Sequence, residues 1–294
     1  MPTAALFQGL CVLSLESRRA VEMERLIRAQ GGVPFVAPSM REVPLEDNPE
    51  AFSFAERLFR GEFDMMILLT GVGTRLLGEV IETRWPPGSF ADALRKMTVV
   101  ARGSKPIAVL REWGVPVTVA VPEPNTWREI LVAIDSWSGG RPERRIALQE
   151  YGRPSVELIH GLRARGAEVV SVPVYQWDLP VDTGPLREAI RTLCANQFDV
   201  AMFTTSVQVV HLLRIAAEMG CEGAARSALG RMMIASVGPT TSETLAELGI
   251  AADFEPSHPK MGFLVNETAA NAARILAAKR MNEARNEPGR AVSQ

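Results

Sequence analysis

Four short turns carry residue types suited to binding anions. Each follows a run of apolar residues and opens a segment with helical spacing: Thr70-Gly71-Val72-Gly73, Gly103-Ser104-Lys105, Thr204-Thr205-Ser206 and Gly238-Pro239-Thr240-Thr241. Backbone N–H groups and hydroxyls at a helix start attract carboxylates and phosphates, because the helix dipole adds positive potential there. For any single turn, helix capping explains the hydroxyls better. Together the turns favour an anion site, because such turns gather at the carboxyl ends of parallel strands.

Basic side chains accompany these turns. They are Arg18, Arg19, Arg75, Arg102, Lys105 and Arg153. Guanidinium groups bind carboxylates through two hydrogen bonds, although many arginines only decorate a solvated surface. Tyr175 follows an apolar run and could donate a proton to a leaving group. Its residue type alone favours a ring packed between domains, with one hydrogen-bond partner for its hydroxyl.

The sequence contains no motif for binding a metal ion or a dinucleotide. His160, His211 and His258 have no His or Cys at ligand spacing, and His211 is better explained as a hydrogen-bonded structural residue. The stretch TGVGTR lacks the third glycine of a dinucleotide fingerprint. The chain has three cysteines, far apart, which predicts a reducing compartment without a zinc site or disulfide framework. We therefore expect no metal and no cofactor.

Length and composition narrow the class of protein. A chain of 294 residues with 47% hydrophobic and 22% charged residues is typical of a soluble globular protein with two domains. Its 32 Lys and Arg against 34 Asp and Glu argue against a nucleic-acid binder held by overall positive charge. No apolar run is long enough to span a membrane, and no basic residue precedes the first apolar stretch as in a signal peptide. We expect a cytoplasmic protein.

The chain contains an internal repeat with an offset of 135 residues. FDMMILLTGVGTRLL, from Phe63, aligns with FDVAMFTTSVQVVHLL, from Phe198, and the same register places Gly103 opposite Gly238. Predicted strands cover 10–15, 33–37, 65–69, 98–101 and 117–120 in the first copy, and 145–148, 168–172, 200–203, 232–235 and 252–254 in the second. Helical patterns such as 19–29 and 206–219 lie between them. The alternation predicts two duplicated α/β domains with parallel sheets.

Two proline-bearing stretches, 38–48 and 173–185, occupy equivalent positions in the repeat. They are either surface loops or a pair of linkers that run between the domains. The polar stretch 281–294 is predicted to be a flexible tail.

The second half resembles uroporphyrinogen-III synthase. The stretches that carry the resemblance are RGAEVVSVPVYQW (165–177), FDVAMFTTSVQVVHLL (198–213), IASVGPTTSETLAELGI (234–250) and PSHPKMGFLV (256–265). The resemblance extends to about residue 279. It implies two flavodoxin-like domains joined by a two-stranded linker, with 1–38 and 176–280 forming one discontinuous domain and 41–172 the other. It also suggests a monomer.

The family closes the linear tetrapyrrole hydroxymethylbilane into uroporphyrinogen III, with inversion of ring D and loss of water. The eight carboxylates of this substrate suit the anion-binding turns, and much of the catalysis would consist of holding a reactive chain in one conformation. The resemblance implies that Tyr175 assists departure of the hydroxyl. The predicted substrate-binding residues are Arg18, Thr70, Gly71, Val72, Arg102, Gly103, Ser104, Lys105, Arg153, Thr205, Ser206, Gly238, Pro239, Thr240 and Thr241.

The first half departs from the family pattern. Where members often carry Thr-Arg-Pro after the first strand, this chain has Leu15-Glu16-Ser17, so that Arg18 would replace the usual arginine. Such departures mark a divergent branch, some of whose members accompany transcriptional regulators. Two alternatives stay open. One is a catalytically retired module that binds a tetrapyrrole or another polyanion and regulates a partner; the other is a periplasmic-type solute receptor, which the missing signal peptide disfavours.

Overall fold

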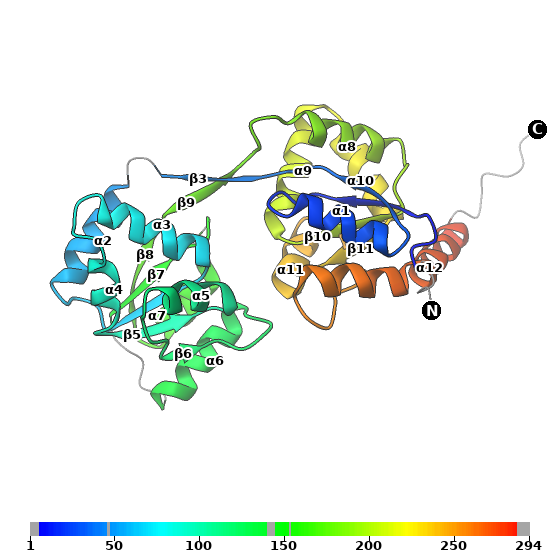
Figure 1. The fold of residues 1–294 in the computed structure, drawn as a ribbon. Helices are drawn as coiled ribbons and strands as arrows, with labels where there is room; N and C mark the ends of the chain where they lie inside the picture. The colour runs from blue at the N-terminus through cyan, green and yellow to red at the C-terminus, as the bar shows by residue number, and fades with distance from the viewer. Residues whose placement is uncertain (1–5, 46–47, 140–144, 153, 287–294) are drawn as a thin grey trace, which may run out of the picture. The chain divides into compact units, whose positions relative to one another are not determined.

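The computed structural model describes residues 6–45, 48–139, 145–152 and 154–286 (Figure 1). The chain divides into unit 1, which comprises 1–41 and 179–294, and unit 2, which comprises 42–178. The sequence placed these boundaries at 38/41 and 172/176. The first and last parts of the chain therefore build one unit around a central insertion that forms the other.

Unit 1 is built on a parallel sheet. Its strands are β1 (Cys11–Ser14), β2 (Val33–Val36), β10 (Val200–Phe203) and β11 (Met233–Ser236), in the spatial order β11-β10-β1-β2. In order along the chain this is the arrangement 2-1-3-4, which is that of flavodoxin-like sheets. Its helices are α1 (Ala20–Ala29), α8 (Gly184–Cys194), α9 (Ser206–Glu218), α10 (Glu222–Arg231), α11 (Pro239–Glu247) and α12 (Met261–Asn286).

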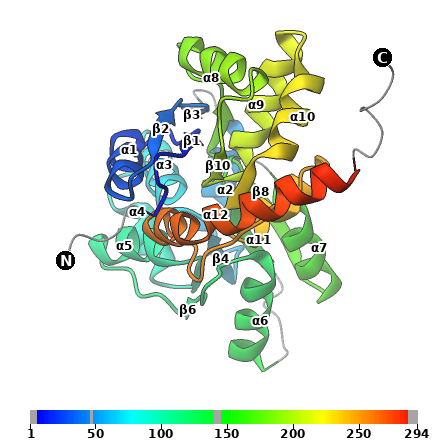
Figure 2. The same cartoon turned by 90° about the vertical axis from the view of Figure 1, so that its right-hand side faces the viewer.

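Helices cover both faces of this sheet, which is why its inner strands are buried and mostly apolar, with Ser14 at the end of β1 as a buried polar residue. One core joins the sheet to α8, α9 and α10 through residues such as Ile190, Leu212 and Leu229. The other joins it to α1 and α12 through Ile27 and Leu264 (Figure 2). The tail predicted from residue 281 is wrong as far as residue 286, because α12 continues to Asn286. The sequence contains no helix breaker until Pro288.

Unit 2 has a five-stranded parallel sheet in the order β6-β5-β4-β7-β8. The strands are β4 (Met65–Leu68), β5 (Thr98–Ala101), β6 (Val119–Ala120), β7 (Arg145–Gln149) and β8 (Glu168–Val172). Helices α2 (Pro49–Phe59), α3 (Gly71–Glu82), α4 (Ser89–Leu94) and α5 (Ser104–Glu112) share one core with the sheet. Helices α6 (Trp127–Ser138) and α7 (Val156–Ala164) form the core on the other face.

The strands of the two units correspond at the offset found in the sequence. Residues 65–68 of β4 lie 135 positions before 200–203 of β10, and 98–101 of β5 lie 135 positions before 233–236 of β11. The order β5-β4-β7-β8 in unit 2 corresponds to the order β11-β10-β1-β2 in unit 1. The first strand of unit 2 along the chain, β4, corresponds to β10, whereas the first strand of unit 1 is β1. The predicted strand at 252–254 is reduced to a single bridge between Phe254 and Ala235. Pro256 follows closely and lacks the N–H that a longer ladder needs.

The two proline-bearing stretches contain a pair of strands. β3 (Arg41–Pro44) and β9 (Tyr175–Asp178) pair in a separate two-stranded sheet (Figure 1). Around it, the Leu45 N–H donates to the Val174 carbonyl and the Arg41 Nε donates to the Leu179 carbonyl. This sheet lies where the chain passes from one unit to the other and back. Of the two interpretations for 38–48 and 173–185, the linker is confirmed over these strands.

Candidate functional site

The carboxyl edge of unit 2 brings several predicted residues together. We use this name for the residues that follow β4, β5, β7 and β8. Thr70 follows β4, Arg102 follows β5, and Tyr175 lies three residues beyond β8. Because β4 lies between β5 and β7, and the direction of the strand order reverses at β4 and β7, this edge is where ligands bind in open α/β sheets.

Arg102 follows β5 at this edge, and its side chain is half-buried. Its Nε donates to the Leu69 carbonyl at 3.1 Å, and its guanidinium carbon lies 4.7 Å from the centre of the Tyr151 ring. Burial lowers the pKa of the Arg102 guanidinium, and the acidic groups around it oppose that shift. An arginine stays protonated at neutral pH nonetheless. Within the described residues Arg102 has no carboxylate in ion-pair contact and no partner for its two terminal amino groups, so four N–H donors remain for a ligand.

Thr70 and Tyr175 meet inside this edge. The Thr70 hydroxyl accepts a hydrogen bond from the Gly73 N–H at 3.0 Å, so it caps helix α3. The same hydroxyl lies 3.3 Å from the Tyr175 hydroxyl. Tyr175 is only 2% exposed, and its ring packs edge to face against Trp177 at 5.4 Å between ring centres. This geometry agrees with the capping interpretation of Thr70 and with a packed ring for Tyr175.

The glycines of the turn after β4 serve close approach. A Cβ on Gly71 would lie 2.8 Å from the backbone oxygen of Lys105, where α5 begins. A Cβ on Gly73 would lie 2.0 Å from the amide nitrogen of Gln149. Gly71 and Gly73 therefore let α5 and Gln149 approach the start of α3. Val72, beside them, is half-buried.

Sequence reasoning missed Gln149 and Glu150, at the end of β7. Gln149 is fully buried, and its Oε1 accepts from the Leu69 and Thr70 N–H groups at 3.2 Å each. The Glu150 side chain is also buried, near Arg102. The sequence repeat could have revealed them. It aligns Gln149 with Ser14 and Glu150 with Leu15, so the Gln-Glu pair occurs only in unit 2.

Helix α5 begins without a side-chain cap. Gly103 has φ of +81°, a left-handed conformation that favours glycine, and its position as N-cap provides no side-chain oxygen. Ser104 and Lys105 follow it at the exposed start of the helix. Arg153, also predicted to bind substrate, lies outside the described residues.

The carboxyl edge of unit 1 groups the other predicted residues, around the ends of β1, β10 and β11. Thr205 and Gly238 are the N-caps of α9 and α11, and no side chain caps either helix. Ser206 and Thr241 are buried, Pro239 and Thr240 are half-buried, and Arg18 is exposed before α1. Capping by hydroxyl side chains therefore explains Thr70 and leaves the starts of α9 and α11 without such a cap.

Glu16 occupies the centre of this second edge. Its carboxylate accepts a hydrogen bond from the Thr204 hydroxyl at 2.5 Å, and Gln208 Nε2 donates to the same hydroxyl at 2.8 Å. β1 and β10 are neighbours at the point where the strand order reverses, so Glu16 and Thr204 lie where a ligand would be expected. His211 lies nearby as a structural residue, as predicted: its Nδ1 is 2.7 Å from the Ser39 carbonyl oxygen.

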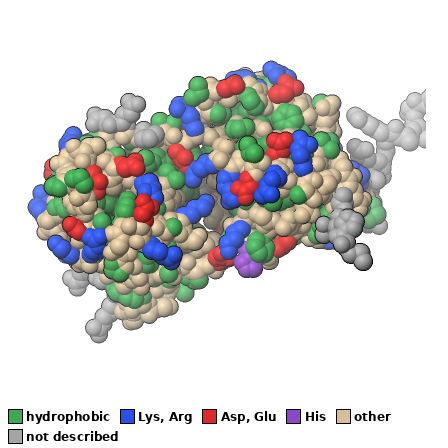
Figure 3. Space-filling view, viewed as in Figure 1, with side chains coloured by type: hydrophobic (Ala, Val, Ile, Leu, Met, Phe, Trp, Pro, Cys, Tyr) green, Lys and Arg blue, Asp and Glu red, His purple; other side chains and the backbone are tan. Residues whose placement is uncertain are grey.

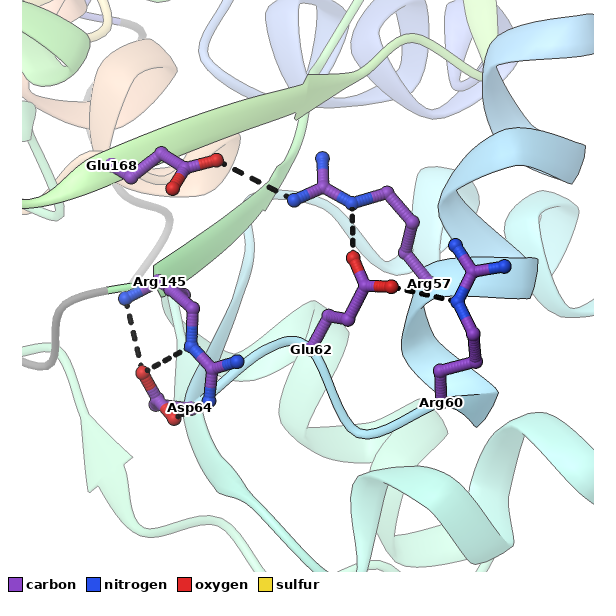
Figure 4. A network of polar contacts seen from close by, with 6 residues as sticks. All are labelled: Arg57, Arg60, Glu62, Asp64, Arg145 and Glu168. Atoms are coloured by element: carbon purple, nitrogen blue, oxygen red, sulfur yellow. Dashed lines mark hydrogen bonds and ion pairs between the residues drawn. The ribbon is translucent and has the colours of Figure 1, made fainter.

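A second polar cluster of unit 2 lies at the opposite, amino edge of the sheet (Figure 4). Asp64 precedes β4 and forms two hydrogen bonds with the Arg145 side chain, at 3.1 and 2.6 Å. Arg57 reaches Glu62 at 2.8 Å and Glu168 at 3.4 Å. Arg145 holds the pKa of Asp64 below its ordinary value, and Arg57 does the same for Glu62. The basic and acidic side chains of this cluster therefore neutralise one another as ion pairs.

Exposed charges elsewhere are also interspersed. On α1, Arg19 pairs with Glu22 and Arg28 pairs with Glu24, and Figure 3 shows acidic and basic side chains side by side over this helix. In the part of the chain that the structure describes, no group of three or more His, Cys, Asp or Glu is placed to hold a metal ion. No helix in that part is both long and apolar enough to cross a membrane.

Comparison with known proteins gives one family. The model of uroporphyrinogen-III synthase HemD matches residues 21–266. The chain is 31% identical over 242 residues to a Methanothermobacter thermautotrophicus protein provisionally named uroporphyrinogen-III synthase, covering 80% of this chain and 87% of that protein. It is 28% identical over 259 residues to the uncharacterised protein YjjA of Bacillus subtilis, covering 86% and 92% of the two chains.

Two solved structures of similar fold come from a uroporphyrinogen III synthase. A crystal structure of a mutant uroporphyrinogen III synthase from Thermus thermophilus matches 92% of this chain and 100% of its own, with a TM-score of 0.68 and 24% identity. A second Thermus thermophilus synthase structure gives a TM-score of 0.50 over 89% of this chain and 99% of its own, also at 24% identity. At this identity the likeness concerns the fold.

Proposed function

The chain belongs to the uroporphyrinogen-III synthase family, and we propose that it is an active synthase that closes hydroxymethylbilane into uroporphyrinogen III. In this reaction the terminal hydroxyl leaves as water, the resulting azafulvene is attacked within the same molecule, and ring D is inverted as the macrocycle closes. The proposal includes a small-molecule substrate, no cofactor, no nucleic acid, and action as a cytoplasmic monomer.

The proposal depends most on the position of the Arg102 guanidinium. This group is a desolvated cation at the carboxyl edge of a parallel sheet, and four of its N–H donors have no partner among the described residues. A carboxylate of the substrate would find there a half-buried bidentate partner that is already partly desolvated. The starts of α9 and α11, which no side chain caps, would supply backbone N–H groups to other carboxylates.

Catalysis in this proposal consists mainly of holding the bilane in the conformation that favours attack at the inverted position. Tyr175 is the candidate to assist departure of the hydroxyl. Because Tyr175 is buried and its hydroxyl lies 3.3 Å from that of Thr70, Thr70 would stand between it and the substrate. The bilane hydroxyl can also leave unaided, so this assistance would be modest.

Analysis of the product isomers tests the proposal. Freshly generated hydroxymethylbilane is incubated with the protein, the products are oxidised, and the type I and type III porphyrins are separated by chromatography. Without an enzyme the bilane closes to type I. We expect an excess of type III. Only type I, formed in the presence of folded protein, would overturn the assignment of synthase activity.

Glu16 favours a second candidate. Its carboxylate stands at the centre of the unit 1 edge and already engages the Thr204 hydroxyl. It stands where members of the family often carry an anion-binding arginine. This departure from the family pattern would suit a catalytically retired module that binds a tetrapyrrole or another polyanion and regulates a partner. Binding of uroporphyrin without formation of type III product would favour this candidate.

A further inference from the structure

Glu150 is a buried carboxylate with no role in the mechanism above. It is 3% exposed. Its two oxygens accept hydrogen bonds from the Ser171 hydroxyl at 3.0 Å and from the Ser155 N–H at 3.1 Å. The Arg102 guanidinium, which lies 4.7 Å from the ring centre of the next residue, Tyr151, acts on Glu150 through space without an ion-pair contact. A carboxylate buried in this way costs stability unless it is paired, so its presence calls for a reason.

The other unit shows that the fold does not require it. At the same offset of 135 residues, Leu15 stands in place of Glu150, Val237 in place of Arg102, and Val36 in place of Ser171. Leu15 is fully buried after β1, as Glu150 is buried after β7. An apolar trio therefore fills the positions that in unit 2 hold a carboxylate, a cation and a hydroxyl. All three polar residues of unit 2 have apolar counterparts in unit 1, which indicates that the three act together.

We infer that Glu150 is a positioning residue that couples the binding of an anion at Arg102 to the uptake of a proton. This inference rests on the proposed function, because the anion is a carboxylate of the tetrapyrrole. In the free protein the Glu150 charge partly neutralises the Arg102 field. A carboxylate bound by the terminal amino groups of Arg102 takes over that neutralisation and adds a second negative charge near Glu150, so that Glu150 then binds a proton.

The surroundings of Glu150 support this order of events. Burial raises its pKa, while Arg102 and the hydrogen bonds from Ser171 and Ser155 oppose the rise. The titratable groups that the structure places around the Arg102 guanidinium are Glu150, Tyr151 and Tyr175. Among these described groups Glu150 is the carboxylate, and the rise in its pKa moves its protonation toward neutral pH.

The experiment measures binding of uroporphyrin III, the oxidised octacarboxylate macrocycle, between pH 6 and 8.5. Calorimetry in two buffers of different ionisation enthalpy gives the number of protons taken up. The variants are Glu150→Gln, which keeps the shape and an oxygen for Ser171, and Glu150→Leu, which installs the residue of unit 1. The matched control is Glu157→Gln, an exposed carboxylate in the first turn of α7.

We expect the wild type and Glu157→Gln to take up a proton on binding, and their affinity to fall by up to about tenfold per pH unit as pH rises. Both Glu150 variants should lose this uptake, show a flatter pH profile and bind more tightly at pH 8. Equal uptake by the wild type and a folded Glu150 variant would overturn the coupling, even if type III product forms. Absence of uroporphyrin binding by the wild type would overturn it too. Uptake that depends on Glu150, without type III product, would support the coupling and remove the synthase assignment.

Discussion

The two edges of the unit 2 sheet hold arginines in opposite circumstances. At the amino edge, Arg57 and Arg145 each contact carboxylates that begin or precede a strand, and these contacts raise the pKa of both guanidinium groups. At the carboxyl edge, Arg102 is desolvated, its pKa is lowered, and its terminal amino groups have no partner among the described residues. The difference indicates that charges paired with one another hold strands in place. A cation with no ion-pair partner among the described residues is available to a ligand.

The largest expected effect separates the two edges by activity. Arg102→Ala should lower the rate of type III formation by roughly 100-fold, because it removes the preformed carboxylate partner. Its urea midpoint should fall modestly, since the variant loses the hydrogen bond to the Leu69 carbonyl and the contact with the Tyr151 ring but no ion pair within the described chain. Arg145→Ala should lower the urea midpoint and leave the rate of the folded protein unchanged. Equal losses of rate in both folded variants would break the comparison. Arg111→Ala, an exposed arginine at the end of α5, is the control.

The next effect concerns the turn that brings α3 and α5 to the carboxyl edge. Gly71→Ala places a methyl group 2.8 Å from the Lys105 backbone oxygen, and backbone cannot swing aside as a long side chain can. We expect a loss of about 1–3 kcal/mol in the free energy of unfolding, measured with urea. Gly223→Ala is the matched control, because its Cβ would meet nothing within 4 Å in helix α10. There we expect a gain of about 0.5–1 kcal/mol. Similar effects at both glycines would contradict the close approach.

The pH dependence of stability tests the ion pair between Asp64 and Arg145 at the amino edge. Arg145 lowers the pKa of Asp64 in the folded protein, so the pair stabilises fully above the unfolded carboxyl pKa of about 3.9 and loses that stabilisation as pH falls through the folded pKa. Asp64→Asn should cost about 1–2 kcal/mol at pH 7 and progressively less as pH falls through the lowered folded pKa of Asp64, as measured by urea unfolding at several pH values. Glu112→Gln breaks an exposed pair with Arg75 and should leave the urea midpoint nearly unchanged. A difference for Asp64→Asn that persists unchanged in acid would rule out the ionic origin.

The smallest expected effect concerns Tyr175. Tyr175→Phe keeps the ring against Trp177 and removes only the hydroxyl beside Thr70. We expect type III formation to slow by about 3- to 10-fold, because the remaining assistance to hydroxyl departure is modest. Trp177→Phe keeps an aromatic ring beside Tyr175 but removes the hydrogen bond that the Trp177 Nε1 donates to the Tyr151 carbonyl at 2.9 Å, and it should leave the rate within about twofold. An unchanged rate in Tyr175→Phe would remove Tyr175 from the mechanism and leave it a packed residue.

Much of the fold was present in local patterns. The predicted strands at 98–101, 168–172 and 200–203 match the observed ones residue for residue, since apolar runs of this length bounded by turns mark buried parallel strands. The repeated Phe-Asp pair that anchored the alignment has a structural cause. Phe63 and Phe198 are buried, while the Asp64 and Asp199 carboxylates accept hydrogen bonds from the backbone N–H groups of Arg145 and Cys11. The end of α12 and the bridge at Phe254 were predicted wrongly, because the positions of Pro288 and Pro256 were not weighed against the polar and apolar patterns around them.

The sequence by itself determined the family, the parallel α/β character, the register between the two copies and the turns that carry hydroxyls, glycines and Arg102. The tertiary structure decided which of those groups are satisfied inside the fold. Thr70 and Thr205 hold the same position in the repeat, yet Thr70 caps its helix and meets Tyr175 while Thr205 caps nothing. Arg102, Glu150 and Ser171 become one network only because β5, β7 and β8 end at a common edge. Periodicity reports which face of an element is apolar, whereas desolvation of a single charge depends on neighbours tens of residues away along the chain.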